Sequence, residues 1–194
     1  MRSIRTRLIP RALRTVPLVP VVGAILLCFP PLRAQSHQAF PSPRSTSRSP
    51  DGQHVIHNVD YNTKEPYHRL LLEDTKTHTT RKLLTYERWV DVFWSPSGAE
   101  VMVDDHGGSD FENTYIYSVQ DTSHRVDIGE EFRRQNPSGR LLFKKNDHVY
   151  VDGLGWVNET TVKIRLWGYG EHDPKGFERL LEYKLNGGIK ITPE

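Results

Sequence analysis

The sequence predicts a mainly β protein built from about three repeated four-stranded antiparallel units, with one short helical insertion. The first observation behind this prediction is a tetrapeptide that returns 46 residues later, Ser49-Pro50-Asp51-Gly52 and then Ser95-Pro96-Ser97-Gly98. Proline presets φ for a tight turn, serine or aspartate can bond the turn backbone, and glycine accepts a positive φ. The second observation is that both copies lead into strand-like runs. Each copy therefore predicts a hairpin corner.

The strands of the first two units follow their corners in the same order. Each unit is expected to run as corner, strand, loop, strand, turn and strand. The expected strands are 54–60, 67–74 and 81–85 in the first unit, and 99–104, 114–119 and 125–128 in the second. This shared order indicates one repeated structural unit.

A third unit follows with an altered corner. Trp94 precedes the second corner, and Trp156-Val157-Asn158-Glu159 occupies the same place in the third, with Asn-Glu in the turn. Strands are expected at 162–167 and 177–185. The third unit is therefore a weaker copy of the first two.

The third corner comes 61 residues after the second instead of 46, so about fifteen residues are inserted between these units. Residues 129–145 fit the insertion, because their charged and apolar residues suggest helical turns broken at Asn136-Pro137-Ser138-Gly139. The alternative is that Pro137-Ser138-Gly139 is itself a degenerate corner. The sequence leaves both interpretations open.

Repeats of about 40 to 50 residues with about four strands each are typical of β-propeller blades. Trp94-Ser95-Pro96-Ser97-Gly98 resembles the Trp-Ser-Pro-Asp-Gly corner of WD40-like repeats of the periplasmic TolB type, with Ser97 replacing Asp, while Arg48 replaces Trp in the first copy. The resemblance covers residues 48–191 and implies blade architecture without any activity. Closed propellers use about four to eight blades. We therefore expect an incomplete or open propeller, which self-association could complete.

The first 36 residues have the composition of a secretory signal peptide of bacterial type. A basic segment without acidic residues precedes nine apolar residues, 21–29, which are too few to span a bilayer. Cleavage is expected after Ser36, with Ala34 as the alternative, and the protein is expected to be periplasmic or secreted. Residues 37–47 are rich in Ser and Pro and predict a disordered linker. Residues 48–194 are the expected propeller-like domain.

The signal peptide also accounts for the apparent basicity of the chain. Residues 1–36 contain six Arg and no acidic residue, so the remainder has 20 basic and 24 acidic residues and a net charge near −4. This balance argues against a nucleic-acid partner. The only cysteine, Cys28, lies in the signal peptide, which excludes cysteine-based chemistry in the mature chain.

In each unit, the polar loop that follows the first strand after the corner is the expected functional surface. These loops are 60–66, 104–113 and 168–174, and the last two combine glycine, histidine and carboxylates. Imidazole and carboxylate groups are suitable ligands for divalent metals. The alternative is that these residues only form solvated turns. The candidate ligand-binding residues are His106, Asp110, Glu112, Tyr169, His172 and Asp173, of which His106, Asp110, His172 and Asp173 are the candidate metal ligands.

Catalytic signatures are weak in this sequence, which favours a non-enzymatic role. Ser109 lacks the Gly-x-Ser-x-Gly context of an activated nucleophile. Asp104 and Asp105 are adjacent in a strand, so their side chains are expected on opposite faces. The sequence therefore favours an exported scaffold that presents its loops to a protein or peptide partner. The alternatives are a metal-binding, hydrolytic domain using the His and Asp loops, and a purely structural remnant.

Overall fold

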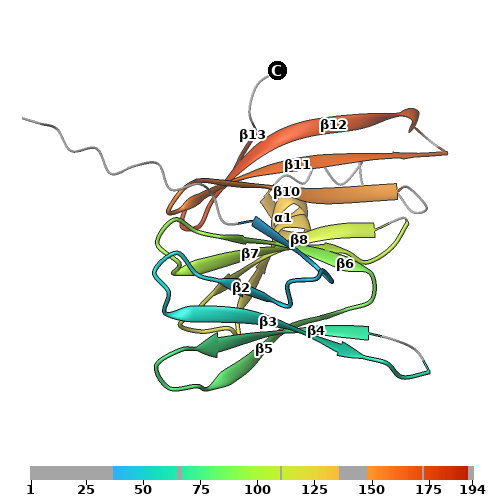
Figure 1. Cartoon of the computed structure of the whole chain (residues 1–194). Coiled ribbons are helices and arrows are strands. Elements are labelled where there is room, and N and C mark those ends of the chain that lie inside the picture. Colours follow the sequence, from blue (N-terminus) through green and yellow to red (C-terminus); the bar gives the residue numbers. More distant parts are fainter. Residues whose placement is uncertain (1–36, 65–66, 110, 136–147, 172, 192–194) are drawn as a thin grey trace, which may run out of the picture. The chain divides into compact units, whose positions relative to one another are not determined.

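The computed structural model describes residues 37–64, 67–109, 111–135, 148–171 and 173–191. These residues form three antiparallel sheets, with β3 to β5 at one end, β6 to β8 in the middle and β10 to β13 at the other end (Figure 1). A parallel pairing of β8 with β10 joins the last two into one nine-stranded sheet. The mainly β, open-propeller prediction is confirmed, since the described strands form blade-like sheets that do not close into a ring. The predicted signal peptide lies outside the described residues.

The first sheet contains four strands in sequence order. Its strands are β2 (Thr46–Arg48), β3 (His54–Tyr61), β4 (Tyr67–Asp74) and β5 (Thr80–Tyr86). Each pairs antiparallel with the next. The first corner joins β2 to β3, and the predicted polar loop joins β3 to β4.

The second sheet repeats this order and adds a strand from the N-terminal side. Its strands are β1 (His37–Phe40), β6 (Trp89–Trp94), β7 (Glu100–His106), β8 (Phe111–Ser118) and β9 (Arg125–Asp127). Strand β1 pairs antiparallel with β6, so the sheet starts with a strand from outside its own repeat.

The third sheet follows a helix and is joined to the second by a short parallel pairing. Its strands are β10 (His148–Asn158), β11 (Thr161–Gly170), β12 (Asp173–Lys184) and β13 (Gly188–Ile191). Among the described residues, two pairs connect β10 to β8, Val149 with Phe111 and Tyr150 with Glu112. Side chains must therefore hold most of this junction together.

The predicted corners have matching hydrogen bonds. In the first, the backbone N–H of His54 donates to Ser49 Oγ at 2.9 Å and Gly52 has a φ of 73°. In the second, the N–H of Glu100 donates to Ser95 Oγ at 3.0 Å and Gly98 has a φ of 82°. In both copies, the serine hydroxyl oxygen therefore accepts a hydrogen bond from the backbone near the start of the next strand, and the glycine adopts the left-handed conformation.

The third corner uses a different residue for the same purpose. Asn158 Oδ1 accepts a hydrogen bond from the backbone N–H of Thr160 at 3.0 Å. Next to it, the Glu159 carboxylate accepts a hydrogen bond from the backbone N–H of Ser97 at 3.0 Å. The altered corner thus contacts the second corner directly.

The prediction of a disordered linker at 37–47 is wrong for this structure, because the segment contributes β1 and β2. Phe40 is fully buried in the first core, and Ser47 Oγ accepts a hydrogen bond from Trp94 Nε1 at 3.0 Å. The Ser- and Pro-rich composition conceals these two anchors. One buried aromatic ring and edge pairing are enough to order a short segment.

Part of the predicted helical insertion is present as α1 (Ile128–Gln135), which buries Ile128 and Phe132. Asp127 Oδ1 accepts a hydrogen bond from the N–H of Glu130 at 2.9 Å and so caps the helix. The alternative corner at Pro137-Ser138-Gly139 lies outside the described residues. Within the described part of the chain, no helix is long and apolar enough to cross a membrane.

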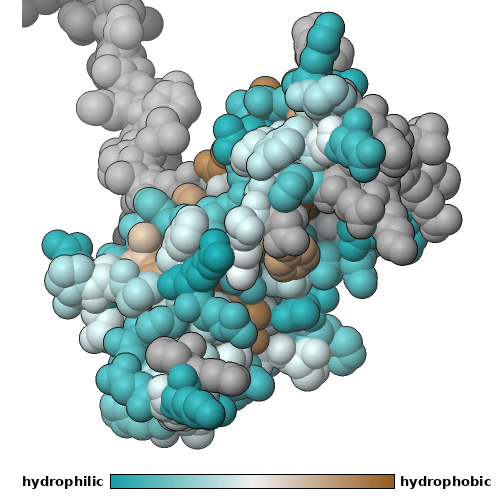
Figure 2. Space-filling view, turned by 90° about the vertical axis from the view of Figure 1, so that its right-hand side faces the viewer, coloured by the Kyte–Doolittle hydropathy of each residue, from teal (hydrophilic) through white to brown (hydrophobic). Residues whose placement is uncertain are grey.

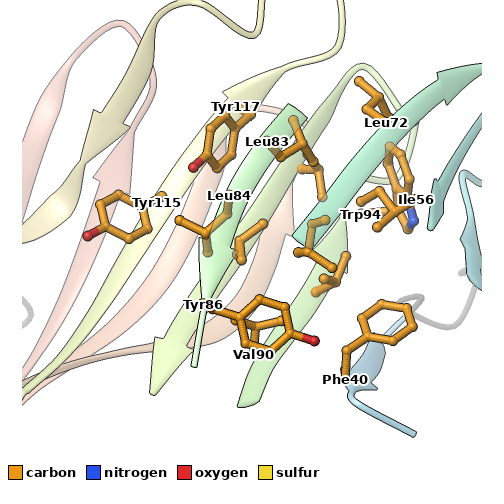
Figure 3. Packing of buried hydrophobic residues seen from close by; sticks show 14 of the residues in the cluster. Phe40, Ile56, Leu72, Leu83, Leu84, Tyr86, Val90, Trp94, Tyr115 and Tyr117 are labelled. Carbon is orange, nitrogen blue, oxygen red and sulfur yellow. The ribbon is translucent and has the colours of Figure 1, made fainter. Parts of the chain in front are cut away.

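Two hydrophobic cores fill the spaces between elements. The first core packs residues of β1 and the first sheet against one face of the second sheet (Figure 3). The second core packs the other face of the second sheet against α1 and the third sheet. Strand β7 contributes to both, because Val101 and Val103 enter the first core while Met102 enters the second.

The burial of Phe40 predicts that β1 contributes strongly to stability. We expect Phe40→Ala to lower the free energy of unfolding by about 3–5 kcal/mol, since it removes a fully buried aromatic side chain. Urea unfolding measures this loss. The matched control is Phe111→Ala, because Phe111 is 48% exposed and its loss leaves no buried cavity. Similar losses in both variants would show that β1 is not packed as described.

Glu100 predicts a pH-dependent contribution to stability. Burial raises the pKa of Glu100 to about 7, although a hydrogen bond with Ser118 opposes the shift. Because the folded-state pKa lies above the unfolded value of 4.5, the stabilising contribution is complete below about pH 4.5 and is lost as the pH rises through 7. We expect Glu100→Gln to raise the melting temperature more at about pH 8 than at about pH 4.5.

Thermal unfolding at the two pH values measures the Glu100 effect. Glu178→Gln is the control, because Glu178 is an exposed carboxylate of β12. The control is expected to change the melting temperature equally at both values. A Glu100→Gln effect that is equally independent of pH would contradict the prediction.

Candidate functional site

The strand register brings the three polar loops to one edge of the sheets, which we call the loop edge. In the first sheet, Tyr61 pairs with Tyr67 across the β3–β4 loop. In the second, His106 and Phe111 flank the β7–β8 loop. The β11–β12 connection lies at the same edge, on the right of Figure 1. Figure 2 faces this edge and shows a mainly hydrophilic surface with separate hydrophobic areas.

A group of buried and half-buried charged residues lies just inside the loop edge. We call it the His106 cluster, and its members are Asp91, Asp104, His106, Glu112 and Asp152. They come from β6, β7, β8 and β10, so the cluster joins the second sheet to the third. Alternation along β7 explains its origin, since Asp104 and His106 are two residues apart and share one face.

His106 lies between two carboxylates from the neighbouring strands. Its Nε2 is 3.0 Å from Asp91 Oδ2 and 3.9 Å from Asp104 Oδ2, while its Nδ1 contacts Glu112 Oε1. The imidazole also stacks on Trp89 with ring centroids 4.8 Å apart. Burial lowers the pKa of His106, but the hydrogen bonds with Asp91 and Glu112 and the charge of Asp104 raise it to about 10.

Asp104 is the most deeply buried carboxylate of the cluster. It accepts hydrogen bonds from the Thr114 hydroxyl at 3.1 Å and from the backbone N–H of Gly153 in β10 at 2.9 Å. Burial and the negative charge of Glu112 raise its pKa well above the usual value. The neighbouring Asp105 is partly buried and lies on the opposite face, as the sequence predicts.

Asp152 extends the cluster into the third sheet. Its Oδ2 accepts hydrogen bonds from Arg165 Nε at 2.6 Å and Trp167 Nε1 at 2.9 Å. Its Oδ1 is buried and accepts no hydrogen bond from a described N–H or hydroxyl group, although the Glu112 carboxyl group is close enough to share a proton with Asp152. The carboxyl group of Glu112 lies beside Asp152, and burial followed by this negative neighbour raises the pKa of Glu112 despite the opposing effect of His106.

Aromatic side chains form the outer part of the loop edge. Trp89, Phe111 and Tyr169 are 45%, 48% and 45% exposed. The register places each of them at the loop edge: Trp89 pairs with His106 across β6 and β7, and Phe111 pairs with Val149 across β8 and β10. Tyr169 pairs with His148, and their rings stack at 4.7 Å.

The structure brings some of the candidate residues together. His106 and Glu112 are in direct contact, and Tyr169 is exposed on the third sheet. Asp110, His172 and the side chain of Asp173 lie outside the described residues. The proximity of the second and third loops through those three groups therefore stays a prediction.

Sequence reasoning missed the participation of Asp91 and Asp152 in this site. Both lie inside strands and outside the three predicted polar loops. The spacing of Asp104 and His106 is a usable signal, because they follow Met102 on one face of β7 and charged residues are rarely fully buried unless paired. Ser109 has a simple structural role, since its carbonyl oxygen accepts the Tyr150 hydroxyl at 2.6 Å.

Comparison with known proteins gives only distant structural similarity. The sequence matches no protein-family model and no curated protein. Among solved structures, it is similar to the β-propeller domain of the Trilobed protease from Pyrococcus furiosus, described as having an open velcro topology. The identity is 15% and the TM-score 0.49, over 78% of this chain and 43% of that chain.

A second similar structure is the AtxE2 isopeptidase in its apo form. Here the identity is 11% and the TM-score 0.48, over 82% of this chain and 30% of that chain. The chain thus spans less than half the length of either protein. The fold assignment rests on the sheet topology. The activities named for these two proteins are not assigned to this chain.

The Asp152 environment predicts a measurable coupling with Arg165. Removing one partner of a buried ion pair costs about 3–5 kcal/mol, and we expect the lower end for Arg165→Met because the arginine side chain is 40% exposed. Adding Asp152→Asn removes the stranded charge and should recover a large part of this loss. Urea unfolding of both single variants and the double variant measures the coupling.

The control for this cycle is Arg134→Met, which breaks the ion pair with Glu131 on the surface of α1. It is expected to cost at most about 1 kcal/mol. Strictly additive effects of Arg165→Met and Asp152→Asn would mean that the two side chains do not stabilise each other.

Proposed function

We propose that the protein is an exported binding module that docks a protein or peptide partner on its loop edge. One observation carries this proposal: Trp89, Phe111 and Tyr169 are about half-exposed at the same edge, although they come from three different strands. Aromatic residues are enriched in protein interfaces and often supply most of the binding energy there. Singly exposed apolar residues need no explanation, but three aromatic rings at one edge do.

The aromatic side chains are held in place by stacking before any partner arrives. Trp89 stacks on His106, and Tyr169 stacks on His148. At the β3–β4 loop, Tyr61 stacks on Tyr67 with centroids 4.7 Å apart, and the Arg69 guanidinium lies 4.6 Å from the Tyr61 ring. Fixed rings lose little conformational entropy on binding, which favours affinity.

Export is part of this proposal and is supported by the composition of residues 1–36. A basic segment followed by a short apolar stretch is typical of a cleaved secretory leader. The partner is then expected in the periplasm or outside the cell. The net charge near −4 of the remaining chain disfavours nucleic acid as that partner.

The experiment compares two pairs of substitutions that remove similar exposed apolar surface. The loop-edge variant carries Phe111→Ser and Tyr169→Ser. The control carries Leu154→Ser and Val157→Ser, which remove residues 43% and 53% exposed elsewhere on β10. Proteins captured from an envelope extract are identified by mass spectrometry, and the affinity of the purified partner is then measured by calorimetry.

We expect the loop-edge variant to bind the partner at least about tenfold more weakly, because truncating interface aromatic anchors typically costs more than about 1 kcal/mol. The control variant should keep the wild-type affinity. Circular dichroism establishes that both variants are folded. Equal affinity of wild type and loop-edge variant, or equal losses in both variants, would refute docking at this edge.

A further inference from the structure

The His106 cluster contains a set of donor groups that suits a metal ion. Asp104, His106 and Glu112 each offer one ligand atom, and these three atoms lie within 4.8 Å of one another. Metal–ligand bonds of about 2.0–2.2 Å place neighbouring ligand atoms about 3–4 Å apart. Because Glu112 contacts His106 Nδ1 whereas Asp104 lies near His106 Nε2, one carboxylate must move around the imidazole ring for all three groups to reach one ion.

A second observation comes from a different strand and points to the same place. The Asp152 side chain is only 8% exposed, and its Oδ1 accepts no hydrogen bond from a described N–H or hydroxyl group. Arg165 and Trp167 both donate to the other oxygen, Oδ2. The Glu112 carboxyl group lies within hydrogen-bonding reach of Asp152. Two buried carboxylates this close repel each other, so a shared proton or a cation between them is favoured.

Carboxyl groups outnumber basic groups in the described part of the cluster. Asp104, Glu112 and Asp152 are three buried carboxyl groups, and Arg165 and His106 are the basic side chains that form ion pairs with them, so a proton or a cation must balance the remaining carboxylate. His106 is also shared with Asp91. A divalent ion would neutralise the excess carboxylates and allow His106 to act as a neutral ligand.

We propose that Asp104, His106 and Glu112 bind a divalent first-row transition-metal ion, with Asp152 Oδ1 as the fourth protein ligand. Zn²⁺ fits best, because one imidazole and several carboxylates in a compact site match its usual ligands and its low coordination number. Ca²⁺ and Mg²⁺ favour oxygen-only sites with more ligands or with retained waters. The ion would connect β7 and β8 to β10, where two backbone pairs of described residues join the sheets.

This assignment differs from the metal site expected from the loops. It keeps His106 but takes its carboxylates from within the strands, at Asp104, Glu112 and Asp152. These residues lie behind the exposed aromatic rings of the loop edge. The ion would therefore support the docking surface structurally without contacting the partner.

The test begins with the purified full-length protein after treatment with a chelator and dialysis. Calorimetric titration with Zn²⁺ is expected to show one site per chain, and elemental analysis should find one zinc per chain after reloading. The melting temperature should rise with Zn²⁺ and fall back when the chelator is added. Ca²⁺ and Mg²⁺ should bind at least about tenfold more weakly than Zn²⁺.

Variants separate a specific site from general affinity for surface carboxylates. Glu112→Gln and Asp104→Asn are expected to weaken Zn²⁺ binding at least about tenfold while keeping the fold, because each also removes a like charge from a crowded site. Asp121→Asn is the matched control. Asp121 Oδ2 pairs with His124 Nδ1 at 3.1 Å in an exposed turn, so its loss should leave zinc affinity and stoichiometry unchanged.

Several results would overturn the assignment. The first is the absence of zinc binding by the chelator-treated wild type. The second is zinc binding that is unchanged in Glu112→Gln or weakened equally in Asp121→Asn. A third is a higher melting temperature for Glu112→Gln with no effect of zinc on the wild type, because that pattern means that protons alone balance the buried carboxylates.

Discussion

The second sheet buries both of its faces, and the rest of the structure is arranged around this requirement. Val101 and Val103 of β7 pack into the core shared with the first sheet, while Met102 packs into the core shared with α1 and the third sheet. A strand with two buried faces has little room for charged side chains. Asp104 and His106 continue the Met102 face towards the loop edge, so they need partners from neighbouring strands. The His106 cluster is thus a direct consequence of the central position of β7.

The cluster and the aromatic loop edge are physically connected through His106. Its imidazole contacts carboxylates on the inner side and stacks on Trp89 towards the surface. The position of an exposed ring therefore depends on charges buried behind it. This connection offers a route by which conditions inside the cluster could influence affinity at the surface, since rigidity of the ring affects the entropy lost on binding.

Much of the fold could be predicted from the sequence, because the same turn residues occur in two of its units. Ser49 and Ser95 accept equivalent backbone hydrogen bonds, and Gly52 and Gly98 both have a positive φ. These two corners were enough to align the first two units. The ordered structure of residues 37–47 could not be predicted, because it depends on the burial of Phe40 in a core of distant residues and on the hydrogen bond from Trp94 to Ser47. Such contacts have no local signature in a Ser- and Pro-rich segment.

The candidate site was predictable to a similar extent. The glycine, histidine and carboxylate composition of the loop 104–113 pointed to His106 and Glu112, which are in contact. Asp91 and Asp152 required knowledge of which strands lie beside β7 and beside β8. The pairing of β10 with β8 is parallel and short, and its partners are separated by an insertion in the chain. No repeat pattern within the sequence specifies that register.

The pairing of β1 with β6 has a further consequence for the first sheet. The chain leaves the second sheet after Phe40, forms β2 to β5, and returns to the second sheet at Trp89. The first sheet is therefore a loop whose two ends are anchored on neighbouring strands. If it detached while β1 and β6 stayed paired, the released residues would remain tethered at both ends and would gain less chain entropy than a free terminal segment. The short strand β1 thus reduces the entropy gained when the first sheet unfolds alone, which makes this partial unfolding less favourable.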